Sequence, residues 1–303
     1  MVPRISLSTS GPDVSRLVYG LYRLLDGQSE SDVHQTLAKI DACLENGITT
    51  LDHAEIYGGH RGHIALGKAI KDRPALRDQV QIITKCGICH INEERPDHWI
   101  KHYNSSAEYI IESTERALAE LCVDAIDILL IHRPDPLMNA DETARAFTEL
   151  RQAGKIKHAG VSNFAVSQFE LLQSRLDFPL VTNQIEISVM QLEAFANGTL
   201  DLCQQRRIHP MAWSPTRQGK LFTSEDEQAT RVRKVLTRIA NRMDATIDQV
   251  AIAWLLTHPA GIVPLIGSTK VERIHSAARA ANMTLDRQDW FAVWEASTGR
   301  PVP

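Results

Sequence analysis

The stretch SAEYIIESTERALAEL (106–121), followed shortly by DILLIHR (127–133), decides the fold class of this chain. The first segment carries apolar residues at helical spacing, and the second is an apolar run of strand length. A helix that leads into a buried strand is the repeating unit of folds in which helices connect parallel strands. The number of repeats along the chain then specifies which of these folds forms.

The same unit recurs on both sides of this stretch. Further strand-length runs, bounded mostly by Gly, Pro, Asn or Ser, lie at 17–23, 49–57, 81–87, 157–163, 182–188, 209–215 and 262–268. Segments with helical periodicity alternate with them, at 31–47, 141–154, 165–176, 246–258 and 271–282. The resulting eight strands predict an α/β fold, a (β/α)8 TIM barrel with parallel strands and right-handed crossovers.

The chain has the length of one such barrel. It contains 303 residues, and a barrel of this type takes about 250. We expect residues 1–303 to form a single domain, with a short N-terminal hairpin and a C-terminal helical extension. Long loops after the third and seventh strands, at about 88–105 and 216–230, should lie at the C-terminal face, where barrel active sites are built.

Composition narrows the class of protein further. Hydrophobic residues make up 43% of the chain and charged residues 23%, as in a globular domain with a sizeable core. A net charge of -4 and the absence of a Lys/Arg-rich run argue against a nucleic-acid partner. No apolar run reaches the ~18 residues of a membrane span, and none resembles a signal peptide. Five scattered cysteines indicate reduced thiols, so we expect a cytoplasmic protein, monomeric by default.

One motif supports two conflicting interpretations. Cys86, Cys89 and His90 have the Cys-x-x-Cys-His spacing that attaches haem. Covalent haem attachment belongs to exported proteins, so we expect no haem here. We expect Cys86 to alternate away from Lys85 into the packing around the barrel, and Cys89 to be an exposed thiol at the start of the insertion. A role for either cysteine stays open.

A second motif concerns metals. His98 and His102 are spaced i, i+4, as two zinc ligands on one helical turn would be. The segment HWIKH lacks the glutamate of His-Glu-x-x-His and lies within the polar insertion. We therefore interpret both as loop histidines near the barrel mouth and expect no metal.

Four polar residues stand at the C-terminal ends of consecutive predicted strands. Asp52 and Tyr57 follow the second strand, Lys85 ends the third, and His132 ends the fourth. Each alone has a structural explanation: a turn aspartate, a rim tyrosine, a surface lysine or a core histidine. Together they form a convergent titratable cluster, which is typical of a functional site.

The segments that carry these residues resemble one enzyme family. They are LDHAEIYG (51–58), ITKCG (83–87), DILLIHRPDP (127–136), AGVSNF (159–164), TNQIEIS (182–188), AWSP (212–215) and PLIGSTK (264–270). Their order and spacing resemble those of the aldo-keto reductases over essentially the whole chain, and most closely a bacterial branch of oxidoreductases of the YdhF type.

The resemblance implies a catalytic tetrad of Asp52, Tyr57, Lys85 and His132. Tyr57 would donate a proton to the alkoxide formed when hydride reaches a carbonyl carbon. Because a free tyrosine has a pKa of about 10, a cationic Lys85 held by Asp52 would lower the pKa of Tyr57. His132 would hydrogen-bond the carbonyl oxygen.

The resemblance also implies a nicotinamide cofactor across the barrel mouth, although the chain has no Gly-x-Gly-x-x-Gly fingerprint. Ser162, Asn163 and Gln184 correspond to carboxamide contacts, and Trp213 to the ring that stacks on the nicotinamide. Other expected contacts are Gly20, Tyr22, Ser214, Pro215, Gly219, Leu221, Gly267, Ser268, Thr269, Lys270 and Arg273. A helix start with Lys270 and Arg273 favours NADP(H) over NAD(H), although Gly267 stands where many relatives have lysine.

Two matters stay open at this level. The expected substrate is a small-molecule carbonyl, an aldehyde or ketone, at a mouth with aromatic residues Trp99, Tyr103, Trp290 and Trp294. The alternative to an enzyme is a non-catalytic NADPH-binding sensor or accessory protein on the same barrel. Turnover with a carbonyl separates the two.

Overall fold

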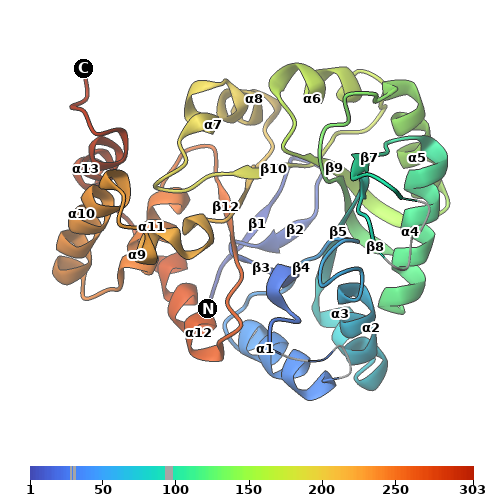
Figure 1. The fold of residues 1–303 in the computed structure, drawn as a ribbon, viewed down its shortest axis with the longest axis horizontal. Coiled ribbons are helices and arrows are strands. Elements are labelled where there is room, and N and C mark those ends of the chain that lie inside the picture. The colour runs from blue at the N-terminus through green and yellow to red at the C-terminus, as the bar shows by residue number, and fades with distance from the viewer. Residues whose placement is uncertain (28, 30–31, 93–97) are drawn as a thin grey trace.

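Eight parallel strands close into a barrel in the computed structural model, which describes residues 1–27, 29, 32–92 and 98–303 (Figure 1). The strands are β3 (Val18–Gly20), β4 (Thr50–Asp52), β5 (Gln81–Cys86), β8 (Ile126–Ile131), β9 (Ile156–Ser162), β10 (Asn183–Glu186), β11 (Met211–Trp213) and β12 (Val263–Ile266). Pairing of β12 with β3 closes the ring. The predicted (β/α)8 TIM barrel and its eight strands are confirmed.

Helices surround the barrel (Figure 1). They are α1 (Val33–Glu45), α2 (Gly62–Asp72), α3 (Leu76–Gln79), α4 (Ala107–Leu121), α5 (Ala140–Gln152), α6 (Val166–Gln173), α7 (Glu193–Ala196), α8 (Thr199–Arg206), α11 (Ile247–Leu256) and α12 (Val271–Arg279). Short 3-10 turns occur at η1 (Leu21–Arg23), η2 (Arg217–Gly219) and η3 (Ala280–Asn282). Within the described residues, no helix combines the length and apolar character needed to cross a bilayer.

The α4–β8 unit shows why these residues form these elements. The side chain of Ser106 caps α4 by accepting a hydrogen bond from the Tyr109 backbone N–H at 3.3 Å. Cys122 ends the helix in a left-handed conformation. One stripe of the helix is buried, whereas all six residues of β8 are buried, as expected for a strand covered on both faces.

The N-terminal end of the barrel is closed by a hairpin of β1 (Arg4–Ser6) and β2 (Asp13–Ser15). Leu7 and Val14 from this hairpin pack with Ile83, Ile128 and other buried strand residues in one cluster. The hairpin was predicted, and it plugs the end of the barrel opposite to the C-terminal ends of the strands. Any active site must therefore use the C-terminal end.

The segment after β11 differs from its prediction as a loop to about residue 230. It contains α9 (Lys220–Thr223) and the long helix α10 (Glu227–Met243), which packs against α13 (Arg287–Thr298). The many charged residues of α10 made its helical pattern hard to recognise in the sequence. Its buried stripe includes Val232, Leu236 and Ile239. Helix α13 is the predicted C-terminal extension.

Trp290 and Trp294, which were expected at the mouth, belong to an aromatic cluster between α13 and α11. The rings of Trp254 and Trp290 stack with centroids 4.7 Å apart, and Trp294 stacks on Trp290. Trp254 Nε1 donates to the Trp290 carbonyl at 3.0 Å, and Trp290 Nε1 donates to the Trp254 carbonyl at 3.1 Å. The tryptophans thus fasten α13 to α11 because both indole N–H groups and both rings find partners there.

A buried histidine on α2 makes stability depend on pH. His63 is 2% exposed; its Nδ1 lies 3.2 Å from Glu120 Oε2 and its Nε2 lies 2.7 Å from Thr84 Oγ1. A neutral ring satisfies both contacts, with Nδ1–H donating to Glu120 and Nε2 accepting from Thr84. Burial, reinforced by neighbouring cationic groups, lowers the pKa of His63 to about 3.

We expect the free energy of unfolding to fall as pH drops from about 6.5 towards 3, because only the unfolded chain then binds a proton at His63. The slope from this residue reaches at most ~1.4 kcal/mol per pH unit. His63→Gln should flatten the dependence in urea unfolding measured between pH 7 and pH 4, whereas His34→Gln, at an exposed site, should leave it unchanged. Equal slopes for wild type and His63→Gln would contradict this prediction.

Candidate active site

The four titratable residues predicted to converge lie together at the C-terminal end of the barrel. Lys85 Nζ donates to Asp52 Oδ2 at 2.7 Å, to the His53 carbonyl at 2.7 Å and to the Tyr57 hydroxyl at 3.1 Å. Asp52 and Lys85 are each 1% exposed. Each of the three N–H groups of the ammonium therefore has an acceptor, and these hydrogen bonds fix the position of the lysine side chain.

The second oxygen of Asp52 is held by Gln184. Its Nε2 donates to Asp52 Oδ1 at 2.7 Å from β10, across the barrel. Gln184 was predicted as a carboxamide contact for the cofactor, and the structure shows in addition that it orients the aspartate. A buried carboxylate with both oxygens bound keeps its partner lysine fixed.

Charges in this cluster affect the pKa values of its members. Burial acts to lower the pKa of Lys85, but the attraction of Asp52 and Tyr57 outweighs it, so the pKa of the lysine is raised. Burial raises the pKa of Tyr57; Lys85 acts in the opposite direction and Asp52 reinforces the increase. Lys85 therefore acts on the Tyr57 pKa in the direction expected from the sequence, but desolvation of the phenolate outweighs it and the net direction is upward.

His132 completes the cluster beside Tyr57. The two ring centroids are 6.0 Å apart at an interplanar angle of 76°. Burial, followed by nearby cations including Lys85 and Arg133, holds the pKa of His132 well below its usual value, so the imidazole is neutral. Its buried Nδ1 has no hydrogen-bond partner among the described residues. A neutral imidazole keeps one N–H donor and one acceptor nitrogen.

Polar residues from β9 to β11 continue the site. Asn163 Nδ2 donates to Ser162 Oγ at 2.8 Å and to the His132 carbonyl at 3.2 Å. Trp213 Nε1 donates to Asn163 Oδ1 at 3.0 Å, and the Arg133 guanidinium lies 5.4 Å from the Trp213 ring centroid. Asn163 has a φ of 62°, a left-handed conformation that asparagine tolerates. These contacts hold three of the predicted cofactor residues in one network.

The β3 and β12 ends supply the region predicted to hold phosphates. A Cβ added at Gly267 would lie 3.4 Å from the Gly20 carbonyl, so the two backbones run close together. Ser268 Oγ accepts from the Lys270 backbone N–H at 3.1 Å, just before α12 begins. Lys270 and Arg273 are exposed there. A helix start with two cations fits a phosphate, although the first turn also carries Glu272.

The remaining predicted contacts lie on the segments that follow β3, β11 and β12. The Tyr22 ring lies 5.2 Å from that of Tyr57 and is 63% exposed. Ser214 and Gly219 have φ values of 53° and 89° in the turns that lead to α9, whose Leu221 is buried. Thr269 is partly exposed and Pro215 is buried.

Comparison with known proteins identifies the family. The model of the Aldo/keto reductase family matches residues 16–297. The chain belongs to this family. Oxidoreductase YdhF of Escherichia coli is 45% identical over 304 residues, covering all of both chains. A 6-dehydroglucose reductase of Agrobacterium fabrum is 44% identical over 99% of each chain. The crystal structure of the thermostable aldo-keto reductase Tm1743, in complex with the inhibitor epalrestat, has a TM-score of 0.82 at 27% identity, covering 97% of this chain and 99% of that one.

Glu55 is a buried carboxylate near the tetrad of this aldo/keto reductase family member, and no sequence pattern indicated it. Glu55 Oε1 accepts from the backbone N–H groups of Gly87 and Ile88 at 2.9 and 3.2 Å. Its Oε2 accepts from Ser113 Oγ at 2.6 Å, and the Tyr109 hydroxyl lies 3.3 Å from both oxygens. Through these hydrogen bonds Glu55 links helix α4 to Gly87 and Ile88, where the insertion after β5 begins.

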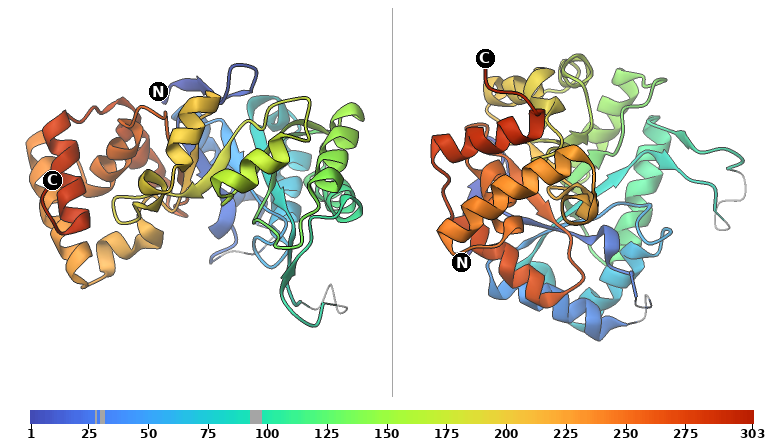
Figure 2. Two further views of the ribbon diagram at one scale, coloured as in Figure 1. Left: turned by 90° about the horizontal axis from the view of Figure 1, so that it is seen from above. Right: turned by 60° about the vertical axis from the view of Figure 1, so that its left-hand side comes forward.

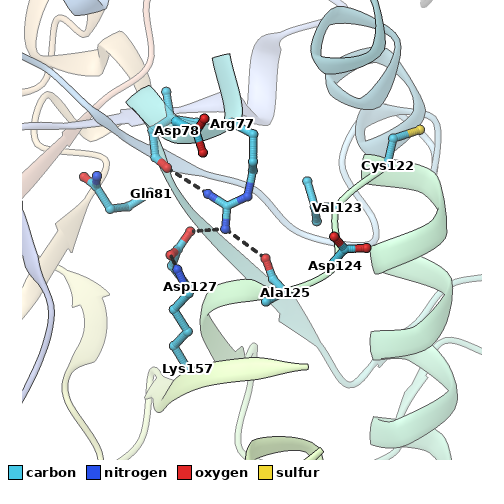
Figure 3. Close-up of a pocket in the computed structure, with 10 residues that line it drawn as sticks. Arg77, Asp78, Gln81, Cys122, Val123, Asp124, Ala125, Asp127 and Lys157 are labelled. Atoms are coloured by element: carbon cyan, nitrogen blue, oxygen red, sulfur yellow. Dashed lines mark hydrogen bonds and ion pairs between the residues drawn. The ribbon is translucent and has the colours of Figure 1, made fainter. Parts of the chain in front are cut away.

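A separate surface hollow lies near the N-terminal ends of β5, β8 and β9 (Figure 3). Arg77 donates to the Ala125 carbonyl and pairs with Asp127, which also pairs with Lys157 and accepts from the Ile82 backbone N–H. Arg77 and Lys157 thus share Asp127 as their ion-pair partner. These contacts link the beginnings of β5, β8 and β9. The tetrad lies at the opposite, C-terminal ends of the strands.

Proposed function

We propose that the protein is an NADP(H)-dependent aldo-keto reductase that reduces an aldehyde or ketone to an alcohol, with Tyr57 as the proton donor. The observation that carries this proposal is the 3.1 Å hydrogen bond from Lys85 Nζ to the Tyr57 hydroxyl, inside a buried Asp52–Lys85 pair and beside a neutral His132. We further propose that the protein is cytoplasmic and monomeric and that its substrate is a small-molecule carbonyl compound.

The residues have complementary tasks in this reaction. The nicotinamide, when bound, supplies the hydride. The raised pKa of Tyr57 keeps its hydroxyl protonated at neutral pH, which is the form that a donor needs. Lys85 then stabilises the phenolate that remains after proton transfer, and Asp52 with Gln184 keeps Lys85 in place. The neutral His132 offers a ring nitrogen to the carbonyl oxygen.

The cofactor preference rests on the start of α12. Lys270 and Arg273 stand exposed beside the Ser268 turn, where the 2′-phosphate of NADP(H) would gain two cations. Ser162, Asn163, Gln184 and Trp213 would hold the nicotinamide end.

The double variant Lys270→Ala/Arg273→Ala should weaken NADPH binding by about tenfold, since both side chains are exposed and lose screened charge-assisted contacts. NADH binding should stay unchanged, because NADH has no 2′-phosphate. Protein fluorescence titration with each nucleotide measures both dissociation constants, with Lys234→Ala on α10 as a matched exposed control. Equal weakening for both nucleotides would place these cations elsewhere than at the 2′-phosphate.

The alternative is a non-catalytic NADPH sensor, and a turnover measurement distinguishes it from a reductase. NADPH oxidation is followed at the nicotinamide absorbance with a panel of aldehydes and ketones. The panel includes 6-dehydroglucose, because a relative that is 44% identical carries the name 6-dehydroglucose reductase. Turnover with any carbonyl supports the reductase. Tight NADPH binding without turnover on the whole panel supports the sensor.

A further inference from the structure

Three side chains outside the tetrad come together on the insertion after β5. They belong to Cys89 on β6 (Ile88–Cys89), to His102 on β7 (His102–Tyr103), and to His98 between them. One potential ligand atom from each lies within 4.8 Å of the other two. Figure 2 shows this part of the chain, coloured teal, projecting beyond the barrel.

The arrangement differs from the helical pair considered from the sequence. Residues 98–102 form no helix, and His102 pairs across the hairpin with Cys89. The rings of His98 and His102 stand with centroids 5.0 Å apart and nearly perpendicular, at 80°. Cys89 is fully buried, so the expectation of an exposed thiol is wrong. The antiparallel pairing supplies a sulfur ligand that no spacing in the sequence indicated.

Hydrogen bonds to carbonyl groups also fix the tautomer of both histidines. His98 Nδ1 lies 3.1 Å from the His90 carbonyl, and His102 Nδ1 lies 2.9 Å from the Ile100 carbonyl. A carbonyl only accepts, so each Nδ1 carries the proton and each Nε2 keeps its lone pair. Hydrogen bonds of this kind orient metal-ligating histidines in proteins.

We propose that Cys89, His98 and His102 form a binding site for a divalent transition metal, best suited to Zn²⁺, with water as the fourth ligand. One thiolate and two imidazoles match zinc chemistry, whereas Mg²⁺ and Ca²⁺ require oxygen ligands. Zn–S and Zn–N bonds of about 2.3 and 2.0 Å place tetrahedral ligand atoms roughly 3.3–3.6 Å apart. The ligand atoms lie within 4.8 Å of one another, so side-chain rotations that bring them closer by up to about 1.5 Å reach that spacing.

The metal would act on the hairpin rather than on the carbonyl. Strands β6 and β7 have two residues each, and a two-stranded hairpin of that size is marginal by itself. Glu55 holds its base through Gly87 and Ile88. A metal bound to both strands and to His98 would hold these three segments together, and its binding energy would add to the stability of the hairpin.

Cobalt(II) titration into the full-length reduced protein tests the site independently of any enzymatic activity. We expect a thiolate-to-cobalt charge-transfer absorption that saturates at one equivalent and disappears when Zn²⁺ is added. Cys89→Ser should abolish the absorption. His102→Gln, at an exposed position, should weaken cobalt binding at least tenfold without impairing folding, which circular dichroism of the metal-free variant verifies.

Matched controls keep the result specific. Cys122→Ser and His34→Gln change an exposed cysteine and an exposed histidine elsewhere and should titrate like wild type. Absence of the absorption in wild type, its persistence in Cys89→Ser, or an unchanged affinity in His102→Gln would each overturn the proposal. If Cys89→Ser does not fold, His102→Gln decides the outcome.

Discussion

Tyr57→Phe is expected to lower kcat for carbonyl reduction by about 10²–10⁴-fold, the usual contribution of a positioned general acid. The substitution removes the hydroxyl that lies 3.1 Å from Lys85 Nζ but keeps the ring against Tyr22 and His132. NADPH affinity should therefore change little. The loss should appear in the chemical step, and steady-state NADPH oxidation combined with fluorescence titration separates the two effects.

Tyr109→Phe serves as the matched control, because it removes a phenol hydroxyl that contacts Glu55 rather than the tetrad. Its kcat should stay within about twofold of wild type. A raised Tyr57 pKa further implies that wild-type kcat shows no alkaline decline due to this group below pH ~10, since the donor stays protonated up to its own pKa. A Tyr57→Phe variant that retains a tenth of the wild-type kcat would assign the proton donor to another group.

Lys85→Met is expected to lower the free energy of unfolding by about 3–5 kcal/mol as well as to abolish turnover. The apolar replacement has similar length but leaves the Asp52 carboxylate buried, with Gln184 as its remaining side-chain donor among the described residues. An unpaired buried charge is the costly state, more than the loss of the pair itself. Asp52→Asn/Lys85→Met should therefore regain part of the stability while remaining inactive.

Urea unfolding monitored by tryptophan fluorescence measures these differences. Lys157→Met provides the comparison, because Lys157 also pairs with a barrel aspartate, Asp127, but is 54% exposed. It should lose no more than ~1 kcal/mol, as surface pairs do. A double variant no more stable than Lys85→Met, or a single variant as stable as Lys157→Met, would show that the buried charge is not the cause.

The barrel was predictable because parallel strands covered by helices must be continuous apolar runs, and such runs are visible in sequence. The six buried residues of β8 are an example. The tetrad was predictable because each member ends or follows a strand, and the C-terminal ends of parallel strands meet at one face. Closure of the ring then follows from the number of strands.

Features that depend on packing across the chain were not predictable. Glu55 reads as an ordinary acidic residue until Gly87, Ile88 and Ser113 are brought to it. The net direction of the Tyr57 pKa shift depends on how deeply the hydroxyl is buried. The sequence predicts that Lys85 is a neighbour but not the extent of this burial. Cys89 reads as a loop residue until β7 covers it.

The buried carboxylate of Glu55 stands between the strand that carries Lys85 and the insertion that follows it. On one side, its contacts with Gly87 and Ile88 keep the strand that carries Lys85 in register. On the other, the insertion continues without a direct hydrogen bond to the tetrad among the described residues. The segment beyond Cys89 can therefore differ in length or sequence without disturbing the hydrogen bonds that join Asp52, Lys85 and Tyr57.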